Sequence, residues 1–114
     1  MFAPLKQLEE LDISSNKINS LVNGVFSHLV SLRKLDLSSN EIENIENDAF
    51  YGLKNMIELD ISFNANFRNI CLDMFRGLFR LNKFHICNGI MDSDKIKEFK
   101  ELFGDTLRIE IRER

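Results

Sequence analysis

Three aspartates recur at one interval, and these residues have the clearest potential for chemistry. Asp12, Asp36 and Asp60 stand 24 residues apart, and His85 occupies the next equivalent position. If equivalent residues lie side by side on neighbouring strands, carboxylates about 5 Å apart could hold a cation or meet a basic partner. The ammonium group of Lys34 would oppose a metal ion between the acidic positions. We therefore expect no metal site and no cofactor, and we keep the aspartates as candidate contacts for a protein partner.

The positions beside the aspartates repeat at the same interval and extend this surface. One neighbouring column alternates in charge, and a second column carries Ser14, Ser38 and Ser62 before it ends at Cys87, which we expect at an exposed strand position. The candidate partner-binding residues are Glu10, Asp12, Lys34, Asp36, Ile57, Glu58, Asp60, Phe63, Lys83 and His85.

Ile57 and Phe63 are unusual because they are apolar at the margin of a polar surface. Phe63 takes the position that Ser15 and Ser39 occupy in the preceding copies. An apolar pair in this place could anchor a protein partner. Alternatively, Phe63 packs under the longer loop of its own repeat, beside Phe67. Both interpretations stay open at this stage.

A Ser-His-Asp set is also present on the expected surface. Ser62, His85 and Asp60 would share one face of the sheet. An open sheet offers no pocket, no third group that orients the base and no oxyanion donors, so we do not expect an enzyme. We expect His85 on the exposed face, where it either binds and titrates or is simply solvated.

A repeated segment must position these residues. The pattern L-x-x-L-x-L-x-x-N occurs three times, with leucine replaced by isoleucine or methionine at some positions: LEELDISSN (8–16), LRKLDLSSN (32–40) and MIELDISFN (56–64). Self-similarity at this period predicts stacked repeats that bury one continuous core. Residues Leu11 to Ile13 read as a short strand, and Asn16 ends it. Because a short amide can bond backbone groups in a turn, we expect the stacked asparagines to form a ladder.

The ends of the chain depart from the repeat. Phe2, Leu5 and Leu8 resemble the tail of an earlier repeat, so we expect a fragment or a shortened array whose uncapped N-terminal end could self-associate. The third repeat is one residue longer, and Phe67 should take the place of Ile42. A degenerate fourth repeat precedes a helix, which should begin at Asp92 or Ser93 and end at Gly104, and then a last strand. We divide the chain into repeats at 1–91 and a closing element at 92–114.

Composition excludes several classes of function. The chain has 114 residues and a net charge of −3, and no cluster of lysine and arginine indicates nucleic acid. No apolar run is long enough for direct membrane insertion.

Cys71 and Cys87 should lie on different sides of the coil, so we expect two free thiols rather than a disulfide. The free thiols and the lack of an Asn-x-Ser/Thr acceptor favour a reducing compartment or an internal piece of a larger ectodomain.

The L-x-x-L-x-L-x-x-N pattern resembles the leucine-rich repeat family over residues 2 to 90. Its 24-residue period, with phenylalanine before x-x-L, is similar to the class that is frequent in Toll-like receptors and other extracellular receptors. The resemblance implies an α/β solenoid, a right-handed coil with a concave parallel sheet, and here a C-terminal helix and strand close it. It also implies that the concave sheet binds another protein, as part of an innate-immune or adhesion ectodomain. Aspartate is common at its position in this family, which favours a structural role. The alternative is a cytosolic scaffold or regulatory subunit that uses the same face.

Overall fold

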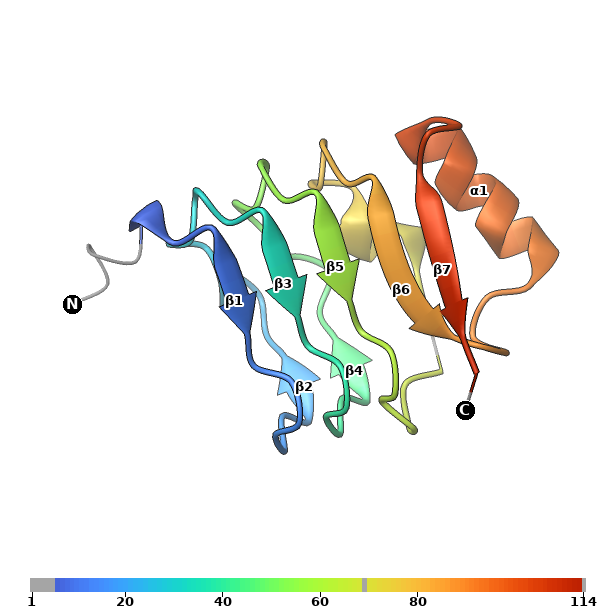
Figure 1. Cartoon of the computed structure of the whole chain (residues 1–114), viewed down its shortest axis with the longest axis horizontal. Helices are drawn as coiled ribbons and strands as arrows, with labels where there is room; N and C mark the ends of the chain where they lie inside the picture. The colour runs from blue at the N-terminus through green and yellow to red at the C-terminus, as the bar shows by residue number, and fades with distance from the viewer. Residues whose placement is uncertain (1–5, 69, 114) are drawn as a thin grey trace.

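Parallel strands stacked in register form the backbone of the molecule. The computed structural model describes residues 6–68 and 70–113. One five-stranded sheet runs across it in the order β1-β3-β5-β6-β7, with every neighbouring pair parallel (Figure 1). Its strands are β1 (Glu10–Asp12), β3 (Lys34–Asp36), β5 (Glu58–Asp60), β6 (Lys83–Cys87) and β7 (Arg108–Arg112). The short strands β2 (Ser20–Leu21) and β4 (Asn44–Ile45) pair in parallel as a second sheet. This architecture confirms the predicted α/β solenoid.

The apolar residues of successive strands meet in one core. Leu11 pairs with Leu35, Leu35 with Leu59, and Leu59 with Phe84, as the 24-residue interval predicts. Alternation along a strand turns these side chains inward and their neighbours outward. No single repeat could enclose its own apolar residues, because each supplies only one or two short strands and a loop.

Phenylalanines from the loops continue the core along the stack. Phe26 stacks on Phe50 with ring centroids 6.4 Å apart, and Phe50 stacks on Phe75 at 5.7 Å. Phe75 lies in the 3-10 helix η2 (Leu72–Phe75). Phe99 adds a further ring, 5.2 Å from Phe75. In the longer third repeat Phe67 is buried, as predicted for the position equivalent to Ile42.

The predicted asparagine ladder is present and joins adjacent repeats. The Asn64 amide nitrogen donates to the carbonyl oxygens of Ile61, Ser62 and Leu37, and its Oδ1 accepts the backbone N–H of Ile42. Asn40 makes the equivalent bonds to its own repeat and to the repeat before it, where Ile13 and Ile18 take part. Asn16 donates only to carbonyl oxygens of its own repeat.

The helix α1 (Ser93–Phe103) covers the far end of the core (Figure 1). It begins after Asp92, whose side chain accepts the N–H of Lys95 at 2.8 Å, and it ends at Gly104, whose φ of 93° suits glycine. Phe99 is fully buried and packs 5.9 Å from Phe84. Strand β7 then joins the main sheet beside β6. The predicted helix and last strand are confirmed, while the division at residues 91 and 92 stays a prediction.

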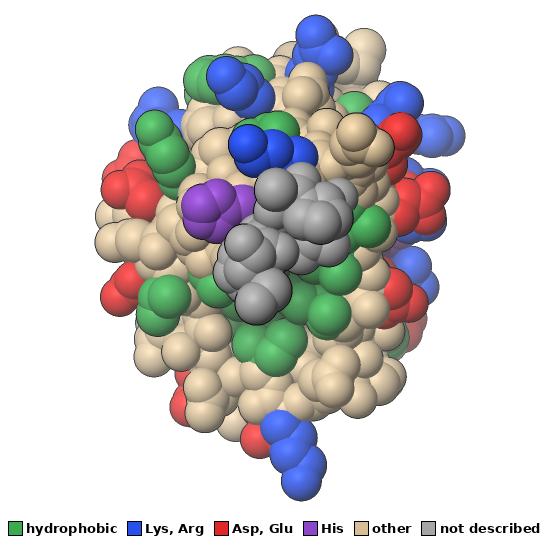
Figure 2. Space-filling view, turned by 90° about the vertical axis from the view of Figure 1, so that its left-hand side faces the viewer, with side chains coloured by type: hydrophobic (Ala, Val, Ile, Leu, Met, Phe, Trp, Pro, Cys, Tyr) green, Lys and Arg blue, Asp and Glu red, His purple; other side chains and the backbone are tan. Residues whose placement is uncertain are grey.

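The opposite end of the stack is less well covered. Leu8, Leu11, Ile13 and Ile18 are half-buried, whereas the equivalent residues of the second repeat are buried. Figure 2 looks onto this end and shows hydrophobic side chains gathered on it. Phe2 and Leu5 lie outside the described residues, and self-association through this end stays a prediction. No helix in the described part of the chain is long and apolar enough to cross a bilayer.

Candidate functional site

The predicted columns of polar side chains lie in register across the main sheet. Glu10, Lys34, Glu58 and Lys83 occupy paired positions, and the aspartates lead to His85 in the adjacent column. We call the side of the sheet that carries these columns the polar sheet face. Strand β7 extends the two columns with Arg108 and Glu110. Lys34 and Glu58 approach one another at 4.0 Å, and charges alternate from Glu10 to Lys83 along this one column.

Each aspartate on the polar sheet face caps the turn that follows its strand. Asp60 Oδ1 accepts the backbone N–H of Ser62 at 2.9 Å and the Ser62 hydroxyl at 2.5 Å, and the two earlier copies repeat this arrangement. The hydrogen bonds from the Ser14 hydroxyl and N–H lower the pKa of Asp12, and the charge of Lys34 adds to this effect. No group of three metal-ligating side chains occurs among residues 6–68 and 70–113. The Asp-x-Ser spacing in the sequence could have indicated this cap, because the two residues are close enough to form it locally.

Phe63 lies on the surface rather than beneath the longer loop. Its side chain is 42% exposed, while Phe67 is buried. Its backbone has a φ of 59°, like Ser15 and Ser39, and this left-handed conformation is costly for a bulky side chain. Its N–H donates to the thiol of Cys87 at 3.0 Å. The structure therefore contradicts the packing interpretation and leaves Phe63 as a candidate contact.

The prediction that His85 is exposed was wrong, because two neighbouring side chains cover it. Its Nε2 lies 2.7 Å from Glu58 Oε2, its Nδ1 lies 3.1 Å from Arg112 Nη2, and the residue is only 5% exposed. A guanidinium group can only donate, so Nδ1 accepts and Nε2–H donates to Glu58. Burial raises the pKa of Glu58, but the hydrogen bond from His85 and the nearby charges of Lys34 and Lys83 outweigh it and lower the pKa.

The Ser-His-Asp residues are not arranged as a catalytic set. The hydroxyl of Ser62 is directed to Asp60, and Ser62 is buried. The two ring nitrogens of His85 are engaged by Glu58 and Arg112. Each member therefore has a different partner from the one that nucleophilic catalysis requires.

Both cysteines are free, as predicted, but Cys87 is not exposed. Cys71 is half-buried and Cys87 is buried. The Cys87 thiol accepts the N–H of Phe63, in the position where serine stands in earlier repeats. The strand β7 lies beside this position, because Cys87 pairs with Arg112.

A shallow groove brings four of the predicted site residues together. Its volume is about 310 Å³, and Glu9 and Arg33 line it together with Glu10, Lys34, Ile57 and Glu58. The other candidates on the polar sheet face do not line this groove. Asp12, Asp36, Asp60, Phe63, Lys83 and His85 are the residues outside it.

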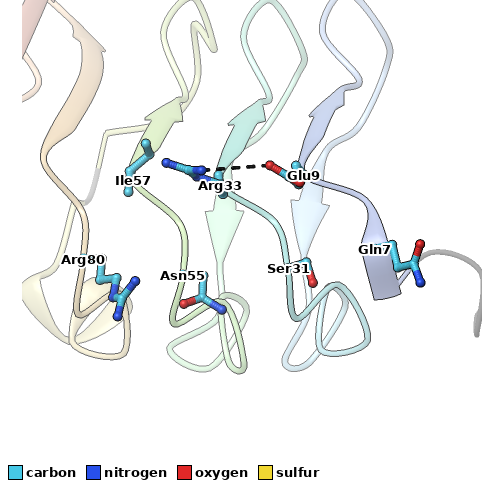
Figure 3. A pocket seen from close by; sticks show the side chains of 7 residues that line it. All are labelled: Gln7, Glu9, Ser31, Arg33, Asn55, Ile57 and Arg80. Atoms are coloured by element: carbon cyan, nitrogen blue, oxygen red, sulfur yellow. Dashed lines mark ion pairs between the residues drawn. The ribbon is translucent and has the colours of Figure 1, made fainter.

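A second groove begins where the first one ends, at the starts of the strands. We call it the edge groove, and its volume is about 620 Å³. Glu9, Arg33 and Ile57 belong to both grooves, and Figure 3 shows them above a second row that the sequence analysis missed. Each member of that row directly precedes the first leucine or methionine of a repeat, which is the signal that could have identified it. The row comprises Gln7, Ser31, Asn55 and Arg80.

The loop side of the solenoid carries an apolar groove that the sequence analysis also missed. Its volume is about 620 Å³, and Phe50 and Met74 form part of its lining. Tyr51 and Phe79 stand at its margin with 68% and 77% of their surfaces exposed. The large aromatic side chains of Tyr51 and Phe79 could have indicated this groove in the sequence, because the equivalent loop positions of other repeats hold smaller or charged residues such as Ser27 and Lys54.

Comparisons with known proteins agree with this architecture. The sequence matches the family described as leucine rich repeat over residues 1–42 and 31–88. The structure is similar to a chain from the structure of the Toll–Spatzle complex, described as a molecular hub in Drosophila development and innate immunity. The TM-score is 0.72 at 24% sequence identity, and the match covers 89% of this chain but 14% of the other. No curated protein matches the sequence.

Proposed function

This chain belongs to the leucine-rich repeat family, and from that premise we propose that it is a protein-interaction module that binds another protein through the polar sheet face. The observation that carries the proposal is the register of the strands, which aligns outward side chains of successive repeats without involving them in the core. We propose nine contact residues: Glu10, Asp12, Lys34, Asp36, Ile57, Glu58, Asp60, Phe63 and Lys83.

The polar sheet face suits recognition for physical reasons. Strands about 4.8 Å apart place the alternating charges of Glu10, Lys34 and Glu58 at regular steps, so a partner with complementary charges meets several of them at once. The exposed ring of Phe63 adds an apolar anchor beside them. His85 supports this surface indirectly, since its hydrogen bond holds the Glu58 carboxylate in place.

The module is proposed to belong to a receptor ectodomain of innate-immune or adhesion character. The likeness of the fold to a chain of the Toll–Spatzle complex supports an extracellular setting. The free thiols of Cys71 and Cys87 and the absence of an Asn-x-Ser/Thr acceptor support the second candidate, a cytosolic scaffold that uses the same face.

Site-directed photo-crosslinking tests both the face and the compartment. A photoreactive side chain replaces Lys34 on the polar sheet face, or Lys97 on the exposed side of α1 as the matched control. Each full chain is illuminated in extracellular and in cytosolic fractions of the source cells. We expect a protein adduct from position 34 alone, and the fraction that yields it identifies the compartment. Equal adducts from both positions would contradict the proposal.

Variants of the face then test the contacts. Glu10→Lys and Lys34→Glu should each weaken binding of the crosslinked protein at least about tenfold, because they place like charges against the partner. Phe63→Asn should weaken binding without loss of folding stability, since asparagine tolerates a positive φ better than phenylalanine. Glu101→Lys on α1 is the control and should leave binding unchanged. Full binding by all three face variants would refute the assignment.

A further inference from the structure

The edge groove is bounded by two rows of residues in register. Ser31, Asn55 and Arg80 form one row, and Arg33 and Ile57 belong to the other. Equivalent residues of adjacent repeats lie about 4.8 Å apart, so each row forms a continuous wall across several strands. Figure 3 shows the two rows one below the other along the starts of the strands, and both line the same groove. A volume of about 620 Å³ is large enough to take several side chains of a bound segment.

The charge of the edge groove is positive and weakly neutralised. Arg33 has one ion-pair partner there, Glu9, at 4.0 Å, and the two side chains are 58% and 65% exposed. An exposed pair at this distance contributes little to stability, so another carboxylate can replace Glu9 readily. Arg80 makes no ion pair with any residue in the described ranges 6–68 and 70–113. Two guanidinium groups thus face one groove that holds a single carboxylate.

The remaining lining fits a carboxylate that is carried on an aliphatic stem. Asn55 is fixed by the hydrogen bond from its Nδ2 to the carbonyl oxygen of Val30 at 3.0 Å, and the Ser31 hydroxyl lies beside it in the row. Ile57 is half-buried and gives the groove an apolar surface between the polar residues. Guanidinium groups bind carboxylates through paired hydrogen bonds, and the methylene groups of a glutamate can pack on Ile57.

We infer that the edge groove binds an acidic segment of the partner polypeptide, whose glutamate or aspartate carboxylates pair with Arg33 and with Arg80. This inference rests on the proposed function, since it specifies the chemistry of the same partner. A nucleic acid is the less suitable occupant, because the side chains that line the groove include no aromatic ring on which a base could stack.

Fluorescence anisotropy with labelled hexaglutamate tests the inference on the full chain at low ionic strength. We expect binding that weakens as salt is added, and Arg33→Gln and Arg80→Gln should each lower the affinity at least about fivefold. Glu9→Gln should tighten binding, because it removes the competing carboxylate from Arg33. Arg76→Gln, on the loop side of the solenoid, is the matched control and should have no effect. Labelled hexalysine should not bind.

Three outcomes would overturn the inference: no hexaglutamate binding, equal losses in Arg80→Gln and Arg76→Gln, or tighter binding of a single-stranded oligonucleotide than of hexaglutamate. The crosslinked partner separates this failure from failure of the proposed function. If that protein loses affinity with Lys34→Glu but not with Arg33→Gln or Arg80→Gln, the polar sheet face binds the partner and the edge groove does not.

Discussion

Replacement of Asn64 by alanine should show how strongly the asparagine ladder joins the repeats. Asn64 is only 4% exposed, and its Oδ1 is the acceptor for the backbone N–H of Ile42, which is fully buried. A buried donor left without an acceptor costs about 1–3 kcal/mol, and loss of the bonds to the Ile61 and Leu37 carbonyls adds about 1 kcal/mol. We therefore expect Asn64→Ala to lower the free energy of unfolding by about 3 kcal/mol.

The matched control is Asn16→Ala, at the equivalent position of the first repeat. Asn16 is exposed and donates only to the carbonyls of Ile13 and Ser14, so water can replace its side chain. We expect a loss below about 1 kcal/mol. Urea unfolding followed by circular dichroism measures both variants. With an m-value of about 1.5 kcal/mol/M, the midpoint should fall by about 2 M for Asn64→Ala and by less than about 0.7 M for Asn16→Ala.

Equal and small losses in the two variants would refute the reasoning. That result would mean that the hydrogen bond from Ile42 to Asn64 contributes no stability beyond that of the local turn. A change in m-value for Asn64→Ala would instead indicate that the repeats no longer unfold together, and near-ultraviolet and far-ultraviolet signals would then give different midpoints.

Three further predictions concern charge, packing and the thiols. The folded chain lowers the pKa of Glu58 from 4.5, so the ionised carboxylate stabilises the fold above that pH, and this stabilisation is lost as the pH falls through the lower, folded pKa. Glu58→Gln should therefore lower the free energy of unfolding at pH 7 and lower it progressively less at acid pH. A pH-independent difference in urea midpoints between the two proteins would contradict this. Phe99→Ala should cost about 3–5 kcal/mol because the ring is fully buried between aromatic neighbours, whereas Leu102→Ala, more exposed on the same helix, should cost below about 1 kcal/mol. A thiol reagent should modify half-buried Cys71 faster than buried Cys87, and both should titrate in denaturant without a reductant; a requirement for reduction would count against free thiols.

The repeat arrangement could be predicted because it depends on interval alone. Leu35 and Leu59 pair because one residue type recurs at one spacing, and Phe67 could be placed in the core from the same spacing. The aspartate caps could also have been found, since the serine that donates to Asp60 lies only two residues away. This cap depends on a neighbour within one repeat, whereas the 24-residue interval relates residues of different repeats.

The burial of His85 could not be predicted from the repeat. It depends on Arg112, which lies on a strand outside the repeating pattern, and on the side-chain conformation of Glu58. The edge groove could not be predicted from the repeat either, because its shape depends on the side chains that line it, Arg33 and Arg80 among them. Periodicity determines where backbones lie, whereas these features depend on side chains that differ between repeats.

The bonds that Asn64 makes to the preceding repeat also restrict how such a chain can change in length. The amide of Asn64 reaches Ile42, and that of Asn40 reaches Ile18, across the same offset in sequence. Excision of residues 32–55 would bring the same atom types into the same positions and would shift the remainder of the solenoid by one step along its axis. Excision of half that length, between Ile42 and Asn64, would leave the amide of Asn64 opposite a different residue. Whole turns are therefore the natural unit by which this chain can lengthen or shorten, and each one would move the polar sheet face by about 4.8 Å relative to a bound partner.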